Sequence, residues 1–148
     1  MRIELIIPGD PIAQPRAKAT AFNGHARMYT PAGKVQDYKA TIRLAAEAAW
    51  KEAGAAPFTG PLRIDCEWVF ARPKGHYGTG KNAAALKPKA PHWHTAKPDR
   101  DNVDKAVLDA LKGFICDDRQ VCVGDLRKRY AMIGETPRTI ICIEELEA

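Results

Sequence analysis

Alternating apolar and polar residues predict four β-strands in this chain. Residues 2–8 form a short run rich in β-branched side chains that ends at a Pro-Gly pair. Residues 62–71 place apolar side chains on one face and mostly charged side chains on the other, which is typical of a strand with one buried face. Two further strands are predicted at residues 120–132 and 139–146.

Two other stretches follow the 3.6-residue period of an α-helix. The first runs from residues 33–34 to about residue 53, where Gly54 is a suitable C-terminal cap. Before the second, Pro98 disfavours helix at the preceding residue, so the chain should enter that helix from an extended or turning segment. The apolar positions of the second helix are Val103, Ala106, Val107, Ala110, Leu111 and Phe114.

The segment at residues 12–33 is irregular and basic, and its Asn23-Gly24 pair predicts a hairpin or a flexible arm. The predicted order is strand, arm, helix, strand, long loop, helix and two strands. We therefore expect a single domain (residues 1–148) of the α/β (α+β) class, with a mixed β-sheet and helices packed on it. Neither a G-x-G-x-x-G motif nor a P-loop occurs, so no nucleotide cofactor is expected.

Charge is distributed unevenly over the 148 residues, whose net charge is +5. Residues 72–100 contain seven Lys and Arg against one acidic residue, whereas residues 101–148 contain seven basic and ten acidic residues. A basic segment beside an acidic one suits a phosphodiester substrate, because cations bind the backbone and carboxylates can hold a metal ion. The alternative is a solvated loop whose lysines aid only solubility. We expect the Pro-, Gly- and Lys-rich loop at about 72–97 to be mobile until it binds such a substrate.

The four cysteines, Cys66, Cys116, Cys122 and Cys142, form neither a C-x-x-C pair nor a zinc-site spacing. Each lies in or beside an apolar run, so we expect small buried side chains. Apolar runs fall short of the roughly 18 residues of a membrane span, and the first residues lack the pattern of a signal peptide. These features predict a cytoplasmic protein without membrane contact.

Carboxylates gather around the start of the second predicted helix. Asp101 and Lys105 are four residues apart, so a helix places them on one side, one turn apart. Asp99 lies just outside the helix, near enough to converge with Asp101, and Asp117-Asp118 follow later. Carboxylate oxygens at the positive end of a helix are what a divalent-cation site needs.

Two other interpretations of these acids stay open. Asp at a helix start is commonly an N-cap, and Asp101 could cap through the N–H of Asp104. The D-x-D pattern also occurs in sugar-nucleotide transferases and phosphatases, although a nucleotide-binding βαβ pattern does not accompany it in this sequence.

Residues outside this region are weaker candidates. Asp65 and Glu67 could add ligands, although alternating acids on a solvated strand face are the default interpretation. His92 and His94 have a chelating spacing but no third ligand nearby in the sequence. Trp93, between the two histidines, could stack on an exposed base.

The motif region resembles one known family closely. Residues 97–111 (KPDRDNVDKAVLDAL) and 117–121 (DDRQV) are similar to the patterns K-P-D-x-D-N, K-A-x-x-D-A-L and D-D-x-Q-V of the RusA family of Holliday-junction resolvases. The stretches at 7–9 (IPG), 14–16 (QPR) and 29–31 (YTP) also resemble that family. The resemblance spans most of the chain. It implies a RusA-like fold and a dimeric, magnesium-dependent endonuclease that resolves four-way DNA junctions by paired symmetric nicks.

The resemblance also implies roles for individual residues. Asp99, Asp101 and Asp118 are the expected catalytic ligands of Mg²⁺, with Mn²⁺ as an alternative ion. The third ligand is Asp117 or Asp118, and the family pattern favours Asp118. Lys105 is the fourth catalytic residue, expected to place a positive charge beside the phosphate as it becomes more anionic.

Four basic residues are assigned to DNA binding. Arg16 matches an arginine of the family pattern, and Lys74, Lys97 and Arg100 belong to the basic segment. The implied partners are four-way junction DNA and a second copy of the chain, because two sites related by a two-fold axis suit symmetric incision. The competing hypothesis is a non-catalytic junction- or single-strand-DNA-binding protein of a phage recombination system. It predicts the same basic loop but no Mg²⁺-dependent nicking.

Overall fold

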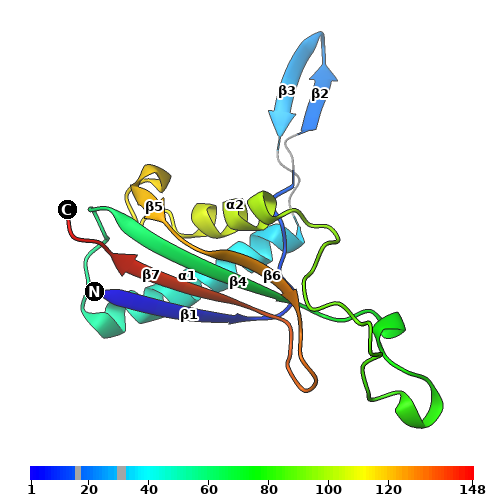
Figure 1. The fold of residues 1–148 in the computed structure, drawn as a ribbon. Helices are drawn as coiled ribbons and strands as arrows, with labels where there is room; N and C mark the ends of the chain where they lie inside the picture. Colours follow the sequence, from blue (N-terminus) through cyan, green and yellow to red (C-terminus); the bar gives the residue numbers. More distant parts are fainter. Residues whose placement is uncertain (16–17, 30–32) are drawn as a thin grey trace.

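A five-stranded mixed sheet and two α-helices form the body of the chain in the computed structural model, which describes residues 1–15, 18–29 and 33–148 (Figure 1). The strands of this sheet are β1 (Arg2–Pro8), β4 (Leu62–Phe70), β5 (Val121–Val123), β6 (Leu126–Tyr130) and β7 (Arg138–Glu145). Their order is β1-β7-β4-β5, with β6 also paired to β4. β4 is parallel to β5 and β6 but antiparallel to β7, which confirms the predicted mixed sheet and fold class.

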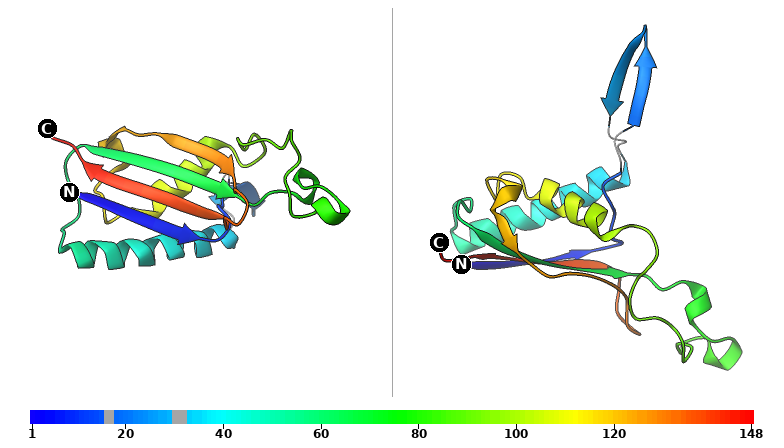
Figure 2. Two further views of the ribbon diagram at one scale, coloured as in Figure 1. Left: turned by 60° about the horizontal axis from the view of Figure 1, so that its bottom comes forward. Right: turned by 45° about the horizontal axis from the view of Figure 1, so that its top comes forward.

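The helices α1 (Lys34–Ala53) and α2 (Arg100–Ala110) lie on one face of the sheet, and the described chain places no helix on the other face (Figure 2). α1 ends as predicted at Gly54, whose φ of 62° is the left-handed conformation that glycine adopts readily. Neither helix is long and apolar enough to cross a membrane, and the other described residues add no such helix.

The core lies between the helices and the sheet. Buried apolar residues come from alternate positions of the strands and from the inner faces of both helices, as the periodicity predicted. They include Ile3, Leu5, Ile7, Ile42, Trp50, Leu62, Ile64, Trp68, Val103, Val107, Ile141 and Ile143. The expectation for the cysteines was only partly right: Cys66 is buried, whereas Cys116 and Cys122 are exposed.

The basic segment after β1 contains the predicted hairpin. Strands β2 (Lys18–Phe22) and β3 (His25–Tyr29) pair antiparallel and are joined at Asn23-Gly24. Both turn residues have positive φ, 49° and 75°, as a two-residue type I′ turn requires. The hairpin extends away from the sheet (Figure 1).

The single strand predicted at residues 120–132 is wrong, because the chain there is a 3₁₀ turn, η3 (Asp118–Gln120), followed by the separate strands β5 and β6. Gly124, between the strands, passes so close to β4 that a Cβ on it would lie 1.9 Å from the carbonyl oxygen of Ile64. The next residue, Asp125, donates its N–H to the Asp65 carboxylate at 2.8 Å. The break therefore depends on contacts with β4, which a local alternation pattern does not contain.

The loop 72–97 contains two 3₁₀ turns, η1 (Lys74–His76) and η2 (Gly80–Asn82). Its last part lies along β6: the Tyr130 N–H donates to the His92 carbonyl at 2.9 Å, and the His94 N–H to the Lys128 carbonyl at 3.1 Å. These bonds fasten the end of the loop to the sheet. Mobility of the rest of the loop before DNA binding stays a prediction.

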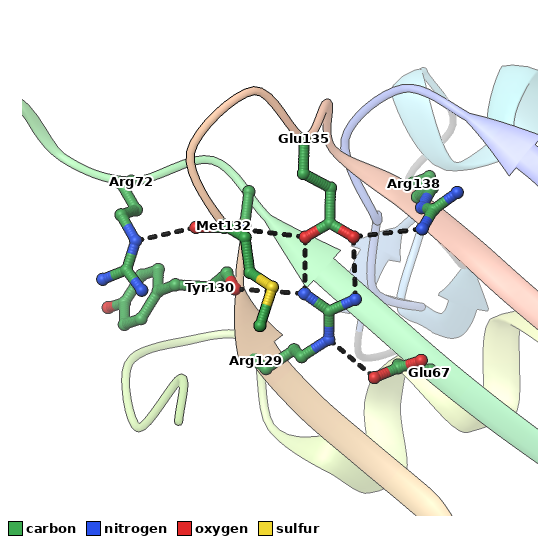
Figure 3. Close-up of polar contacts among 8 residues, drawn as sticks. Glu67, Arg72, Arg129, Tyr130, Met132, Glu135 and Arg138 are labelled. Atoms are coloured by element: carbon green, nitrogen blue, oxygen red, sulfur yellow. Dashed lines mark hydrogen bonds and ion pairs between the residues drawn. The ribbon is translucent and has the colours of Figure 1, made fainter. Parts of the chain in front are cut away.

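Arg129 on β6 organises a cluster of ion pairs with Glu67, Glu135 and Arg138 (Figure 3). Arg129 donates to Glu67 at 2.6 Å and makes two bonds to Glu135, of 2.5 and 2.8 Å. Glu67 alternates with the core residues of β4, so this Arg129 cluster lies on the helix-free face. The hydrogen bonds from Arg129 lower the pKa of Glu135 to about 2. Glu67, which the sequence offered as a possible additional ligand, is thus an ion-pair partner of Arg129.

Candidate active site

Asp99 stands at the N-terminus of α2 but does not cap it with its side chain. Its backbone is extended (φ −69°, ψ 151°), and its carbonyl oxygen accepts the N–H groups of Asn102 and Val103, both at 3.2 Å. Asp101 lies inside the first turn, so the interpretation of Asp101 as the N-cap is wrong. Both carboxylates are exposed at the positive end of the helix.

One turn further along α2, Lys105 is exposed, whereas its neighbour Asp104 is half-buried. A cavity of about 200 Å³ lies between Asp104 and the start of the β5–β6 region. Its other lining residues are Ile64, Val121, Cys122, Val123, Gly124 and Leu126. Burial raises the pKa of the Asp104 carboxyl; the charge of Arg100 opposes this, and that of Asp118 adds to it.

The two acids that follow α2 have different surroundings. Asp117 accepts hydrogen bonds from the backbone N–H and the guanidinium of Arg119, at 2.8 and 3.0 Å, and its own N–H donates to Gln120 at 2.7 Å. The bonds from Arg119 lower the pKa of Asp117. Asp118 is exposed and makes no side-chain hydrogen bond or ion pair within the described residues. Asp117 therefore serves the local turn, and Asp118 is available for another partner.

Among the acids of α2 and η3, Asp104 and Asp118 lie near enough together for the charge of Asp118 to help raise the pKa of Asp104. The acids of these two elements do not form a closed ligand set: across residues 1–15, 18–29 and 33–148, no three His, Cys, Asp or Glu side chains are close enough together to hold a metal ion. Asp99, Asp101 and Asp118 are nevertheless all carboxylates without an ion-pair partner in this part of the chain, and such hard oxygen donors suit Mg²⁺ or Mn²⁺.

The basic residues assigned to DNA lie in different places. Lys97 and Arg100 are exposed and flank Asp99 along the chain, so their charges lie close to the candidate ligands. Lys74 is exposed in η1, within the loop 72–97. Arg16 lies outside the described residues.

The two histidines and the tryptophan of the loop 72–97 have separate environments. His94 is buried and stacks on Phe70 with ring centroids 3.7 Å apart, and this burial lowers its pKa. Trp93 is 56% exposed and lies opposite Arg129, which places it on the helix-free face and away from α2. His94 is thus a packing residue, and base stacking by Trp93 stays a prediction.

Sequence reasoning missed two charged residues beside this site, Asp104 and Lys128. Lys128 on β6 is half-buried and lies near enough to Asp99 for the carboxylate to raise its pKa, against a larger lowering by burial. The sequence did contain a signal for Lys128: it lies between Leu126 and Tyr130, where the alternation of the strand predicts an inward side chain. Asp104 carried no comparable signal, because several acids share the polar side of α2.

Comparison with known proteins gives one family. Residues 8–144 match the family model described as "Endodeoxyribonuclease RusA". A similar protein of Bacillus subtilis (strain 168), named "Uncharacterized protein YqaN", is 33% identical over 150 residues, which cover 99% of this chain and 98% of the relative. Both matches extend over the stretch that contains α2 and η3.

Proposed function

The chain belongs to the RusA family of endodeoxyribonucleases, and from this premise we propose that it is a Mg²⁺-dependent enzyme that resolves four-way DNA junctions in recombination or repair. The observation that supports this best is the group of exposed carboxylates and cations at the start of α2, where Asp99 and Asp101 stand beside Lys97 and Arg100 along the chain. Asp118 of η3 lies near enough to Asp104 of α2 for their charges to interact. Such a combination suits a metal-assisted attack on a phosphodiester.

In this proposal Asp99, Asp101 and Asp118 hold the ion, which polarises the scissile phosphate and lowers the pKa of an attacking water. No ion pair holds these carboxylates within the described residues, and the proposal requires that they turn toward a shared cation when it binds. Lys105, one turn from Asp101, keeps its ammonium group at the surface, where it can stabilise the extra negative charge that develops on the phosphate.

We assign the third ligand to Asp118, and paired substitutions test this choice. Asp118→Asn should slow junction nicking by about 100- to 1,000-fold, because it removes a ligand of the metal. Asp117→Asn should stay within about 3-fold of the native rate, because exposed ion pairs such as Asp117–Arg119 contribute little. Single-turnover rates on a synthetic junction measure both. The reverse order of effects would transfer the role to Asp117.

Arg16, Lys74, Lys97 and Arg100 are proposed to contact the DNA backbone. Phosphate contacts by Lys and Arg position a protein on DNA without reading its sequence, and they make binding weaken with salt. The two cations next to Asp99 would hold the scissile strand, whereas Lys74, in the loop 72–97, would contact a neighbouring arm.

We further propose that the enzyme acts as a homodimer, because two sites related by a two-fold axis are the simplest means of paired incision. On a plasmid that extrudes a cruciform, coupled sites should produce linear DNA without a build-up of nicked circles. Gel filtration at the same protein concentration should give the mass of a dimer. Nicked circles that accumulate beside a monomeric protein would contradict this part of the proposal.

The second candidate function is a non-catalytic protein that binds junctions or single-stranded DNA. The absence of a three-carboxylate cluster among the described residues favours it. Such a protein would have the same basic surface as the nuclease. This hypothesis predicts that junctions are bound but stay uncut in the presence of Mg²⁺ or Mn²⁺.

A further inference from the structure

We propose that Lys128 is a positioning residue for the candidate active site: its ammonium group holds the segment that leads into Asp99 by a hydrogen bond to the Ala96 carbonyl. The inference deepens the proposed function and rests on it, because orienting Asp99 matters for catalysis only if the protein is a nuclease. The attachment of the segment to Lys128 is a property of the fold alone and can be tested without nuclease activity.

The register of the sheet directs the Lys128 side chain toward α2. In the parallel pairing of β6 with β4, Lys128 lies beside Trp68, and its neighbours in alternation lie beside Cys66 and Phe70. These three residues of β4 are buried in the core on the helix-covered face. Lys128 therefore extends from an inward-facing strand position toward the side of the sheet on which α2 begins.

The ammonium group of Lys128 meets the chain just before α2. Its Nζ donates a hydrogen bond of 2.9 Å to the carbonyl oxygen of Ala96, three residues before Asp99. The same group lies 5.9 Å from the centroid of the Phe70 ring, and the Lys128 carbonyl accepts the N–H of His94. One residue thus ties the end of the loop 72–97 to β6 through both its backbone and its side chain.

Lys128 carries its charge at an unusual position in the strand. An inward strand position normally carries an apolar residue, and a half-buried ammonium loses hydration there. Burial lowers the pKa of Lys128, and the charge of Asp99 opposes this lowering. The hydrogen bond from Lys128 to the Ala96 carbonyl fixes the chain three residues before Asp99 and so helps to orient that carboxylate. Residues that orient metal ligands from behind in this way commonly change metal affinity or activity by 10- to 100-fold when replaced.

Lys128→Met is the informative substitution, because methionine keeps the length of the side chain and suits an inward strand position. We expect its thermal midpoint to equal or exceed that of the native protein. The single-turnover nicking rate at saturating protein and Mg²⁺ should nevertheless fall by about 10- to 100-fold. Junction affinity without metal should stay within about 2-fold. Lys128→Arg, which keeps the charge and a donor, should recover the rate to within about 3-fold of native.

Arg127→Met is the matched control, because Arg127 is the preceding residue of β6 and its side chain is exposed on the helix-free face. It should nick at the native rate. Hydrogen–deuterium exchange supplies the readout that needs no activity: peptides that cover residues 95–99 should exchange faster in Lys128→Met than in the native protein or in Arg127→Met.

Three results would overturn the inference. One is unchanged exchange at residues 95–99 in Lys128→Met, which would show that Lys128 does not hold the segment. Another is a native nicking rate in that variant. The third is a rate loss explained entirely by weaker junction binding, which would make Lys128 a phosphate contact. If the native protein itself does not nick, the proposed function fails, and the exchange measurement still decides whether Lys128 holds the segment.

Discussion

Asp101→Asn should abolish incision of a four-way junction, lowering the single-turnover rate by about 1,000-fold or more. A bound metal ion stabilises the charge of the transition state by several kcal/mol, and a loss of about 4 kcal/mol lowers a rate by about 1,000-fold. Asn keeps the shape of Asp but loses the charge that holds the ion. Asp101 is exposed in the first turn of α2 and has no ion pair within the described residues, so the fold should not change. Junction affinity measured without metal should stay within about 3-fold of native.

The matched control for this substitution is Asp37→Asn. Asp37 is likewise an exposed acid in the first turn of a helix, α1, but it lies outside the candidate site. It should nick at the native rate. An Asp101→Asn variant that retains activity would remove Asp101 from the ligand set. A variant that loses affinity to the same extent as rate would instead assign Asp101 to DNA binding or folding.

Arg129→Met should lower the free energy of unfolding by about 3 kcal/mol, because removal of one partner from a largely buried ion pair leaves the other charges uncompensated. The Arg129 side chain is 11% exposed, and Glu135 beside it is 15% exposed (Figure 3). For a chain of this size the melting temperature should fall by about 6–12 °C. Denaturant unfolding monitored by tryptophan fluorescence measures the change.

The acid dependence of stability gives an independent check on this prediction. The pKa of Glu135 is about 2 in the folded protein, against an ordinary value of 4.5. A lowered pKa contributes stability above about pH 4.5, and that contribution is lost as the pH falls toward 2. Arg129 is the largest cause of this lowering, beside the Met132 N–H and Arg138. Arg129→Met should therefore lose much of the contribution, and its stability should depend less on pH over that range. Arg127→Met should behave as the native protein. Equal stability of Arg129→Met and native protein at pH 7 would show that the Arg129 cluster does not stabilise the fold.

Local signals were sufficient for the elements that form from neighbouring residues. The helix at α1 was predicted nearly to the residue, because its apolar period and Gly54 are both local. The hairpin was predicted from Asn23-Gly24, since only a few residue types accept positive φ at both turn positions. The break at Gly124 was missed because it arises from the close approach of β4, sixty residues earlier in the chain.

The residues of the candidate site also fall into those that local sequence predicts and those that depend on the tertiary fold. Asp99, Asp101 and Lys105 were predicted from a motif that spans the start of α2, and their spacing along that helix follows from helix geometry. Lys128 was missed because its approach to Asp99 depends on the parallel register of β6 with β4. The choice of Asp118 over Asp117 came from the family pattern and stays a prediction; the structure adds that Asp117 is engaged with Arg119.

Incubation of the purified protein with a synthetic four-way junction, with and without Mg²⁺, tests the central claim most directly. The proposed function predicts paired, symmetric nicks in two opposed strands that appear only with Mg²⁺ or Mn²⁺, while a linear duplex of the same sequence stays intact. A junction that is bound but uncut at every concentration of either metal would contradict it and favour the non-catalytic binding protein.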